Sequence, residues 1–162
     1  MFMMRRACPT DAGALYEVMI SSRVFPEALK NISGEEAIKK IKESFKEKQF
    51  YIAIQGKNIV GYTSFAPMGL YPDLELLSRT VNKREYCMSS GLVVKPSFRN
   101  KGIAMQLKLY AFKEASKKYK RMYSTLSANN KASVRLQRSL GLKKAGEYNR
   151  KGRKMLIFFK RL

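Results

Sequence analysis

Histidine and tryptophan are absent from this chain of 162 residues. Without histidine, the Ser-His-Asp and Cys-His forms of nucleophilic catalysis are excluded, as is acid–base catalysis by an imidazole. The two cysteines, Cys8 and Cys87, are too few for a disulfide framework and, without histidine, do not build one of the usual zinc sites. We therefore expect no metal site, and any chemistry must use carboxylates, tyrosine, serine, cysteine, lysine or backbone groups.

Long apolar runs are also missing, since none approaches the roughly 18 residues that a membrane-spanning helix requires. The N-terminus lacks a basic region followed by a long apolar stretch, so no signal peptide is predicted. The hydrophobic share of 45%, with nine Phe and nine Tyr, indicates a folded protein. We expect a cytoplasmic protein without membrane association, folded as one domain over residues 1–162 and present as a monomer or a homodimer.

Acidic residues are scarce in the second half of the chain. Residues 91–162 carry 20 Lys and Arg but only Glu114 and Glu147, so this region holds +18 of the total net charge of +21. Such a surface attracts polyanions. A phosphorylated cofactor, nucleic acid, a ribosome surface and an anionic membrane all fit this charge, and so does a basic surface without a specific macromolecular partner.

Hydrophobic periodicity and turn signals predict the order β-α-α-β-β-β-α-β-α-β-β, which is typical of an α/β protein with a mixed (α+β) sheet and helices on both faces. Strands are predicted over residues 3–8, 50–55, 59–65, 86–94, 121–127, 145–149 and 154–160. Helices are predicted over residues 9–21, 33–45, 103–119 and 131–140. The segment 66–84 is less regular, with a possible short helix over residues 73–81.

The strongest local signal runs from Leu92 to Ala104: a strand, a basic turn with one glycine, and a long helix. Free backbone N–H groups at a helix start bind phosphate, and Gly102 permits a close backbone approach. Arg99 and Lys101 add positive charge. An ordinary tight turn between strand and helix is the alternative interpretation of this segment.

Two motifs in this chain resemble those of the GCN5-related N-acetyltransferase (GNAT) family. The sequence Arg99-x-x-Gly102-x-Ala104, preceded by Val94-Lys95-Pro96, is similar to the family's pyrophosphate-binding motif, Arg/Gln-x-x-Gly-x-Gly/Ala. The block from Asn130 to Leu142 is similar to the family's later motif, Asn-x-x-Ala-x-x-x-Tyr-x-x-x-Gly-Phe. The resemblance extends over essentially the whole chain.

This resemblance implies a mixed sheet of about seven strands flanked by about four helices, and an acyltransferase that moves an acetyl group from acetyl-CoA to a primary amine by direct attack in a ternary complex. The acceptor would be a small amine or an amine of a protein. Backbone groups would hold the cofactor, with Asn130 bonding the pantetheine arm or capping its own helix. The implied cofactor-binding residues are Leu92, Val93, Val94, Arg99, Asn100, Lys101, Gly102, Ile103, Ala104, Asn130 and Ser133.

The catalytic groups depart from the family pattern. Gln137 stands where the family often has a tyrosine that donates a proton to the leaving thiolate, and a glutamine cannot donate a proton. Tyr148 and Tyr110 are candidate substitutes, while Glu85, Glu75 and Ser89 are candidates for the general base or for ordering a water that acts as one. Cys87 is expected to be a buried small apolar side chain.

Two further expectations concern partners. The long connection over residues 67–85 is the expected specificity element, with Leu70, Tyr71, Leu74 and Leu77 lining an acceptor cleft or packing on the core. The alternative function is a weakly active or non-catalytic basic module that binds RNA, the ribosome or another polyanion. Gln137 and the positive charge motivate that alternative, but the sequence shows no recognisable nucleic-acid-binding motif.

Overall fold

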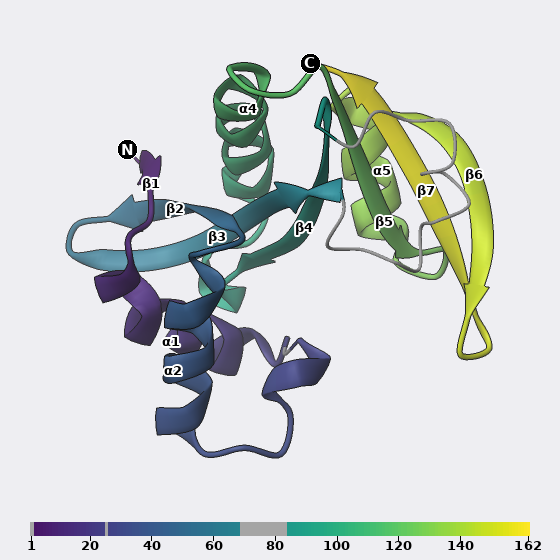
Figure 1. The fold of residues 1–162 in the computed structure, drawn as a ribbon. Coiled ribbons are helices and arrows are strands. Elements are labelled where there is room, and N and C mark those ends of the chain that lie inside the picture. Colours follow the sequence, from purple (N-terminus) through teal and green to yellow (C-terminus); the bar gives the residue numbers. More distant parts are fainter. Residues whose placement is uncertain (1, 25, 69–83) are drawn as a thin grey trace. The chain divides into compact units, whose positions relative to one another are not determined.

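The computed structural model describes residues 2–24, 26–68 and 84–162 (Figure 1). The strands are β1 Met3–Arg6, β2 Gln49–Gln55, β3 Asn58–Pro67, β4 Tyr86–Val94, β5 Arg121–Ser127, β6 Lys143–Arg150 and β7 Arg153–Arg161. The α-helices in the described ranges are α1 Ala12–Ser22, α2 Gly34–Ser44, α4 Ile103–Ser116 and α5 Lys131–Ser139.

The seven strands form one sheet in the order β1-β2-β3-β4-β5-β7-β6. Strand β4 pairs with β5 in parallel, whereas β1 with β2, β5 with β7 and β6 with β7 pair antiparallel. This mixed sheet with its helices confirms the predicted fold class. The possible helix over residues 73–81 and Glu75 lie outside the described residues.

Several predicted boundaries differ from the structure. The first strand ends at Arg6 rather than at residue 8, and α1 begins at Ala12, after a 3-10 turn over Pro9–Asp11. Helix α4 ends at Ser116 rather than at residue 119, because the amides of Lys117 and Lys118 bond to carbonyls three residues back and so tighten the last turn. Strands β6 and β7 extend to Arg150 and Arg153 because Lys151 and Gly152, both with positive φ, form a two-residue turn that suits a twisted hairpin.

The structure divides into two compact units, residues 1–64 with 91–111 and residues 65–90 with 112–162. In the first unit, β2 carries side chains to two apolar layers, because successive residues of a strand point to opposite faces. Phe50, Ile52 and Ile54 pack with α1 and α2. Ala53 packs on the other face, in a cluster with Val60, Val94, Ile103 and Leu107. This second layer fixes the start of α4 beside the end of β4.

In the second unit, successive side chains of β4, β5 and β7 likewise point to opposite faces of the sheet. Met68, Tyr86, Met88, Tyr123 and Ile157 form one apolar cluster, with Tyr148 and Phe159 packed against it. Ser89 and Ser124, one residue along from Met88 and Tyr123, therefore point to the opposite face. That opposite face is the one covered by α5, because Gln137 of α5 hydrogen bonds to Ser124.

Candidate functional site

At the end of β4, the backbone N–H and C=O groups of alternate residues point away from β3. The amide of Lys95 donates to the carbonyl of Val60 (2.9 Å), and a Cβ added at Gly61 would lie 2.9 Å from the carbonyl oxygen of Val93. Val93 and Lys95 thus direct their backbone groups to β3. Because these directions alternate along a strand, the N–H and C=O of Leu92 and Val94 face the other way. This is the strand edge predicted to pair with an extended ligand.

Gly91 interrupts β4 with a φ of +61°. This conformation favours glycine, and within a strand it marks a local bulge that re-aims the backbone. A Cβ at this exposed position would lie 3.4 Å from the Tyr62 ring and 3.5 Å from the hydroxyl oxygen of Ser64. Neither Tyr62 nor Ser64 carries a sequence motif, and only the strand pairing brings them beside Gly91.

The turn from β4 into α4 presents several backbone N–H groups. Asn100 and Gly102 have φ angles of +59° and +75°, and the first α-helical bond runs from the Gln106 amide to the Gly102 carbonyl (3.1 Å). The amides of Ile103, Ala104 and Met105 precede that bond and have no carbonyl one turn back in the helix. Such a row of amides at a helix N-terminus is suited to binding an anion.

Side chains hold this turn in place. The carbonyl oxygen of Val94 accepts hydrogen bonds from the Arg99 Nε (3.1 Å) and the Ser22 hydroxyl (3.3 Å). The Lys101 ammonium lies 5.2 Å from the centroid of the Phe98 ring, and Phe98 itself packs on the core. Arg99 and Lys101 thereby bring two positive charges to the turn, as the motif predicted.

The second unit contains a buried polar group around Ser124. Gln137 Nε2 donates to Ser124 Oγ at 3.1 Å, and both side chains are about 95% buried. Gln137 Oε1 has no hydrogen-bond partner within the described ranges. Ser124 is also paired in register with Ser89, which is buried too. Ser89 and Gln137 are therefore brought together through Ser124, a residue that the sequence did not single out.

Asn130 caps α5, because its Oδ1 accepts a hydrogen bond from the amide of Ser133 (3.1 Å). The capping role predicted for Asn130 is thus confirmed. Asn130 is exposed, and its Nδ2 donor group is not used by the cap, which is compatible with a second role in ligand binding. Asn130 and Gln137 are seven residues apart and so lie on nearly the same line along α5.

The remaining candidates lie elsewhere. The Glu85 carboxylate forms an ion pair with Lys120 (2.7 Å) just before β4 begins. Tyr148 packs in the apolar cluster on the sheet face opposite Ser89 and Ser124. Tyr110 makes an edge-to-face contact with Tyr51. Burial raises the pKa of the Cys87 thiol to about 12, so the thiol is protonated at neutral pH, consistent with a packing role.

Across residues 2–24, 26–68 and 84–162, no group of three or more Cys, Asp or Glu side chains is placed to hold a metal ion. No helix in these ranges is both long and apolar enough to cross a membrane.

Comparison with known proteins gives a family match. The model of the acetyltransferase (GNAT) family matches residues 15–142. No curated protein sequence matches the chain. Many solved structures share the fold, and three examples follow, each at 22% sequence identity or less.

The N-acetyltransferase from Staphylococcus aureus Mu50 superposes with a TM-score of 0.77 at 20% identity, over 99% of this chain and 98% of the other. A ribosomal-protein-alanine N-acetyltransferase from Brucella melitensis has a TM-score of 0.75 at 22% identity, over 99% of both chains. The protein yncA from Salmonella typhimurium, solved with its cofactor acetyl-CoA, has a TM-score of 0.75 at 18% identity, over 99% of this chain and 94% of the other.

Proposed function

The chain belongs to the acetyltransferase (GNAT) family, and on that premise we propose that it transfers an acetyl group from acetyl-CoA to a primary amine in a ternary complex. The amine nitrogen attacks the thioester carbonyl carbon, the new C–N bond forms, the C–S bond breaks and the thiolate leaves. The enzyme must therefore hold the donor, polarise the carbonyl and accept the proton that the amine loses.

The observation that carries this proposal is the start of α4. Asn100 and Gly102, with positive φ on either side of Lys101, turn the backbone so that the first amides of the helix are available to an anion. Arg99 and Lys101 supply positive charge to the same turn. The residues present therefore fit a pyrophosphate group, and we assign this role to the backbone of Arg99, Asn100, Lys101, Gly102, Ile103 and Ala104.

We assign the pantetheine arm to the outward-facing backbone groups of Leu92 and to the N–H of Val94, because the Val94 carbonyl already accepts from Arg99 and Ser22. Val93 holds β4 on β3. An amide of this strand would polarise the thioester carbonyl and stabilise the negative charge that develops on its oxygen during attack. Asn130 and Ser133 of the second unit are assigned to cofactor binding on the motif alone, with Nδ2 of Asn130 as the donor while its Oδ1 caps α5 by accepting from the Ser133 amide. Acetyl-CoA itself supplies an activated carbonyl and a thiolate leaving group.

Proton transfer is assigned to the group around Ser124. Because Ser124 Oγ accepts from Gln137, its own hydroxyl proton is free to be donated, and Gln137 Oε1 is free to accept a hydrogen bond. A thiol has an ordinary pKa near about 8.5, so a thiolate leaves without a strong acid. Ser89 would order the water that takes the amine proton. Glu85, which pairs with Lys120, and Tyr148, which packs in the apolar cluster, are the other candidates.

The binding step is tested by isothermal titration of the full chain with acetyl-CoA, where micromolar binding with one site per chain is expected. Turnover is tested by thiol release on a panel of small amines, amino acids and peptides. A Cys8→Ser chain suits this assay because Cys8 is exposed, whereas Cys87 is buried with a raised pKa. Absence of acetyl-CoA binding at high micromolar concentration would contradict the proposal. Binding without release on any amine would support the non-catalytic alternative.

A further inference from the structure

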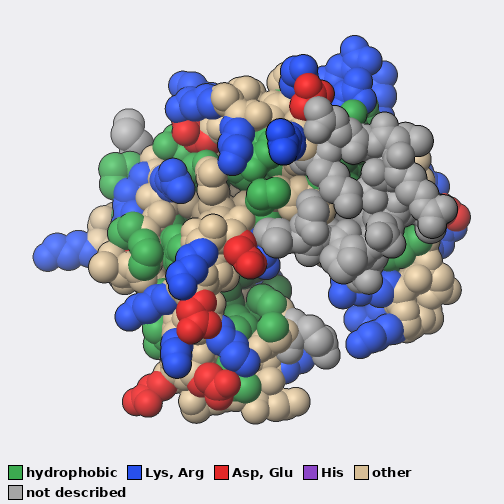
Figure 2. Space-filling model, in the orientation of Figure 1, with side chains coloured by type: hydrophobic (Ala, Val, Ile, Leu, Met, Phe, Trp, Pro, Cys, Tyr) green, Lys and Arg blue, Asp and Glu red, His purple; other side chains and the backbone are tan. Residues whose placement is uncertain are grey.

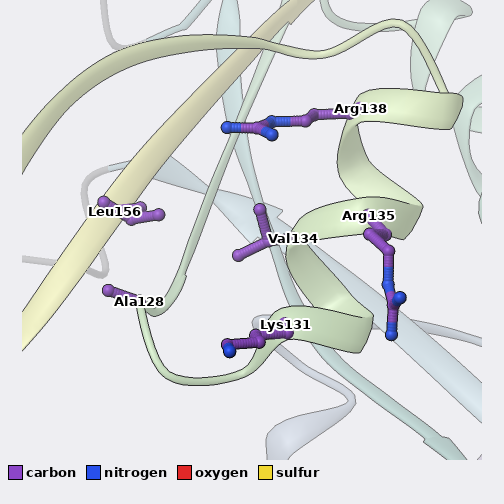
Figure 3. A pocket seen from close by; sticks show the side chains of 6 residues that line it. All are labelled: Ala128, Lys131, Val134, Arg135, Arg138 and Leu156. Carbon is purple, nitrogen blue, oxygen red and sulfur yellow. The ribbon is translucent and has the colours of Figure 1, made fainter.

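A pocket of about 360 Å³ lies between α5 and β7 in the second unit (Figure 3). It is lined by Ala128, Lys131, Val134, Arg135, Arg138 and Leu156. Figure 3 shows Lys131, Val134 and Arg138 extending from α5 toward the side where Leu156 and Ala128 lie, while Arg135 points along the helix. The volume is within the range of small-ligand pockets, about 300–1,000 Å³.

The three cations of this pocket form a row. Lys131, Arg135 and Arg138 follow a spacing of four and then three residues, which places them on one side of a helix. All three are exposed, and none forms an ion pair within the part of the chain that the structure describes. Like charges at this spacing repel each other. The row therefore stabilises the protein only if an anion binds to it.

Among the described residues, no carboxylate of the protein supplies that anion. Residues 112–162 contain two, Glu114 and Glu147. Glu114 pairs with Lys117 (2.7 Å), and Glu147 pairs with Lys144 (2.7 Å) and Lys154 (2.8 Å). In Figure 2, most of the acidic side chains in view gather around α2.

The floor of the pocket decides which kind of anion fits. Ala128, Val134 and Leu156 are aliphatic and only partly buried, and the lining has no aromatic ring. Single-stranded nucleic acids gain much of their affinity from stacking on aromatic rings, which this lining does not offer. Aliphatic side chains beside carboxylates match both the floor and the rim, and arginine binds carboxylates through two parallel hydrogen bonds.

We propose that this pocket docks an acidic peptide segment of a partner protein. An aliphatic side chain of the peptide enters between Val134 and Leu156, and flanking carboxylates meet Lys131, Arg135 and Arg138. The cation row begins one residue after Asn130, but its side chains leave α5 in a different direction from those of Asn130 and Gln137. It therefore lies about 100° around α5 from the line through Asn130 and Gln137.

The test uses the full chain and a fluorescein-labelled peptide of alternating glutamate and leucine, followed by fluorescence polarisation. Binding should weaken at least about tenfold in the K131Q/R135Q/R138Q variant, and should fall as salt rises. The matched control is K39Q/K42Q/K46Q, which removes three positive charges at α2 and its C-terminal end and should change affinity less than twofold. A peptide with serine in place of leucine tests the floor without altering the protein, and should bind several-fold more weakly.

Four results would overturn the proposal. These are no peptide binding, equal loss in both charge variants, equal affinity for the serine peptide, or tighter binding of a ten-nucleotide single-stranded RNA that the K131Q/R135Q/R138Q variant abolishes. Saturating acetyl-CoA should leave the peptide bound, and displacement would instead assign the cations to the cofactor. Because peptide docking and acetyl-CoA binding are measured separately, either proposal can fail while the other stands.

Discussion

Gln137 Nε2 donates a hydrogen bond to Ser124 Oγ at 3.1 Å, and the other end of the same amide, Oε1, is buried without a partner among the described residues. An unpartnered buried acceptor costs about 1–3 kcal/mol relative to a satisfied one. Gln137 therefore satisfies Ser124 and leaves its own oxygen available. This arrangement costs the free protein stability and is explained if a ligand donor meets Oε1.

Gln137→Leu should separate stability from activity. Leucine removes the unpartnered oxygen but also the donor to Ser124 Oγ, so the two effects oppose each other and the free energy of unfolding should change by less than about 1 kcal/mol. Acetyl transfer should fall about tenfold, which corresponds to about 1.4 kcal/mol of lost transition-state stabilisation. Urea unfolding and thiol release measure the two effects. Lower stability with unchanged kcat would mean that Gln137 is only a structural residue.

Gly102→Ala should weaken acetyl-CoA binding through the backbone. The space is open, since an added Cβ would lie 3.8 Å from the nearest side-chain atom, Gln106 Nε2, but φ is +75°. Alanine in this conformation costs about 1–2 kcal/mol, and a shifted turn should cost about tenfold in Kd. Gly152→Ala is the matched control, because Gly152 also has φ +75° and no atom within 4 Å of an added Cβ. Both variants should lose similar stability, but only Gly102→Ala should bind acetyl-CoA more weakly. Equal Kd values for the two variants would refute the role assigned to Gly102.

Asn130→Ala should lose a helix cap and a cofactor contact together. The cap is worth about 1 kcal/mol. Ser33→Ala is the control, since Ser33 caps α2 by accepting from the Glu36 amide at 3.2 Å. Both variants should lose similar stability in thermal unfolding, but only Asn130→Ala should bind acetyl-CoA more weakly in calorimetry. Asn130→Asp should keep the cap and still lose affinity, because a carboxylate cannot donate and repels an anionic ligand.

Asp11 should give the free energy of unfolding a dependence on acidic pH. Arg5 donates to both carboxylate oxygens of Asp11 at 2.8 Å, and mainly this pairing, with a hydrogen bond from the Cys8 amide, lowers the pKa of Asp11 from 3.8 to about 2. A pKa lowered in the folded state gives stability that is complete above pH 4 or so and is lost as pH falls toward 2.

Asp11→Asn should therefore cost about 1 kcal/mol at pH 7, after allowance for an Arg5 side chain that is 40% exposed, and much less at pH 2.5. Glu147→Gln is the control. Its pKa is also lowered to about 2, by hydrogen bonds from Lys144 and Lys154, but the carboxylate is fully exposed, so stability should not change measurably. Urea unfolding at the two pH values measures both variants, and a pH-independent loss for Asp11→Asn would contradict the expectation.

The sequence by itself determined the element order, many boundaries and the glycine turn to which we assign phosphate binding, because these depend on local rules. The limits of β4 and β5 follow from apolar runs between turn residues, and the start of α5 follows from Asn130 as its cap. The positive φ at Gly102 could likewise be expected from the residue type, because glycine adopts this conformation at little cost.

Tertiary structure alone decided which polar side chains meet. Ser124 carries no motif, and only the parallel register of β4 on β5 and the packing of α5 bring it to Ser89 and Gln137. The same alternation of strand faces moved Tyr148 to the opposite side of the sheet. The cation row is visible in the sequence, but the pocket exists only because Leu156 of β7 lies opposite α5. Local chemistry sets the elements, whereas contacts between residues far apart in the chain depend on strand register and helix docking.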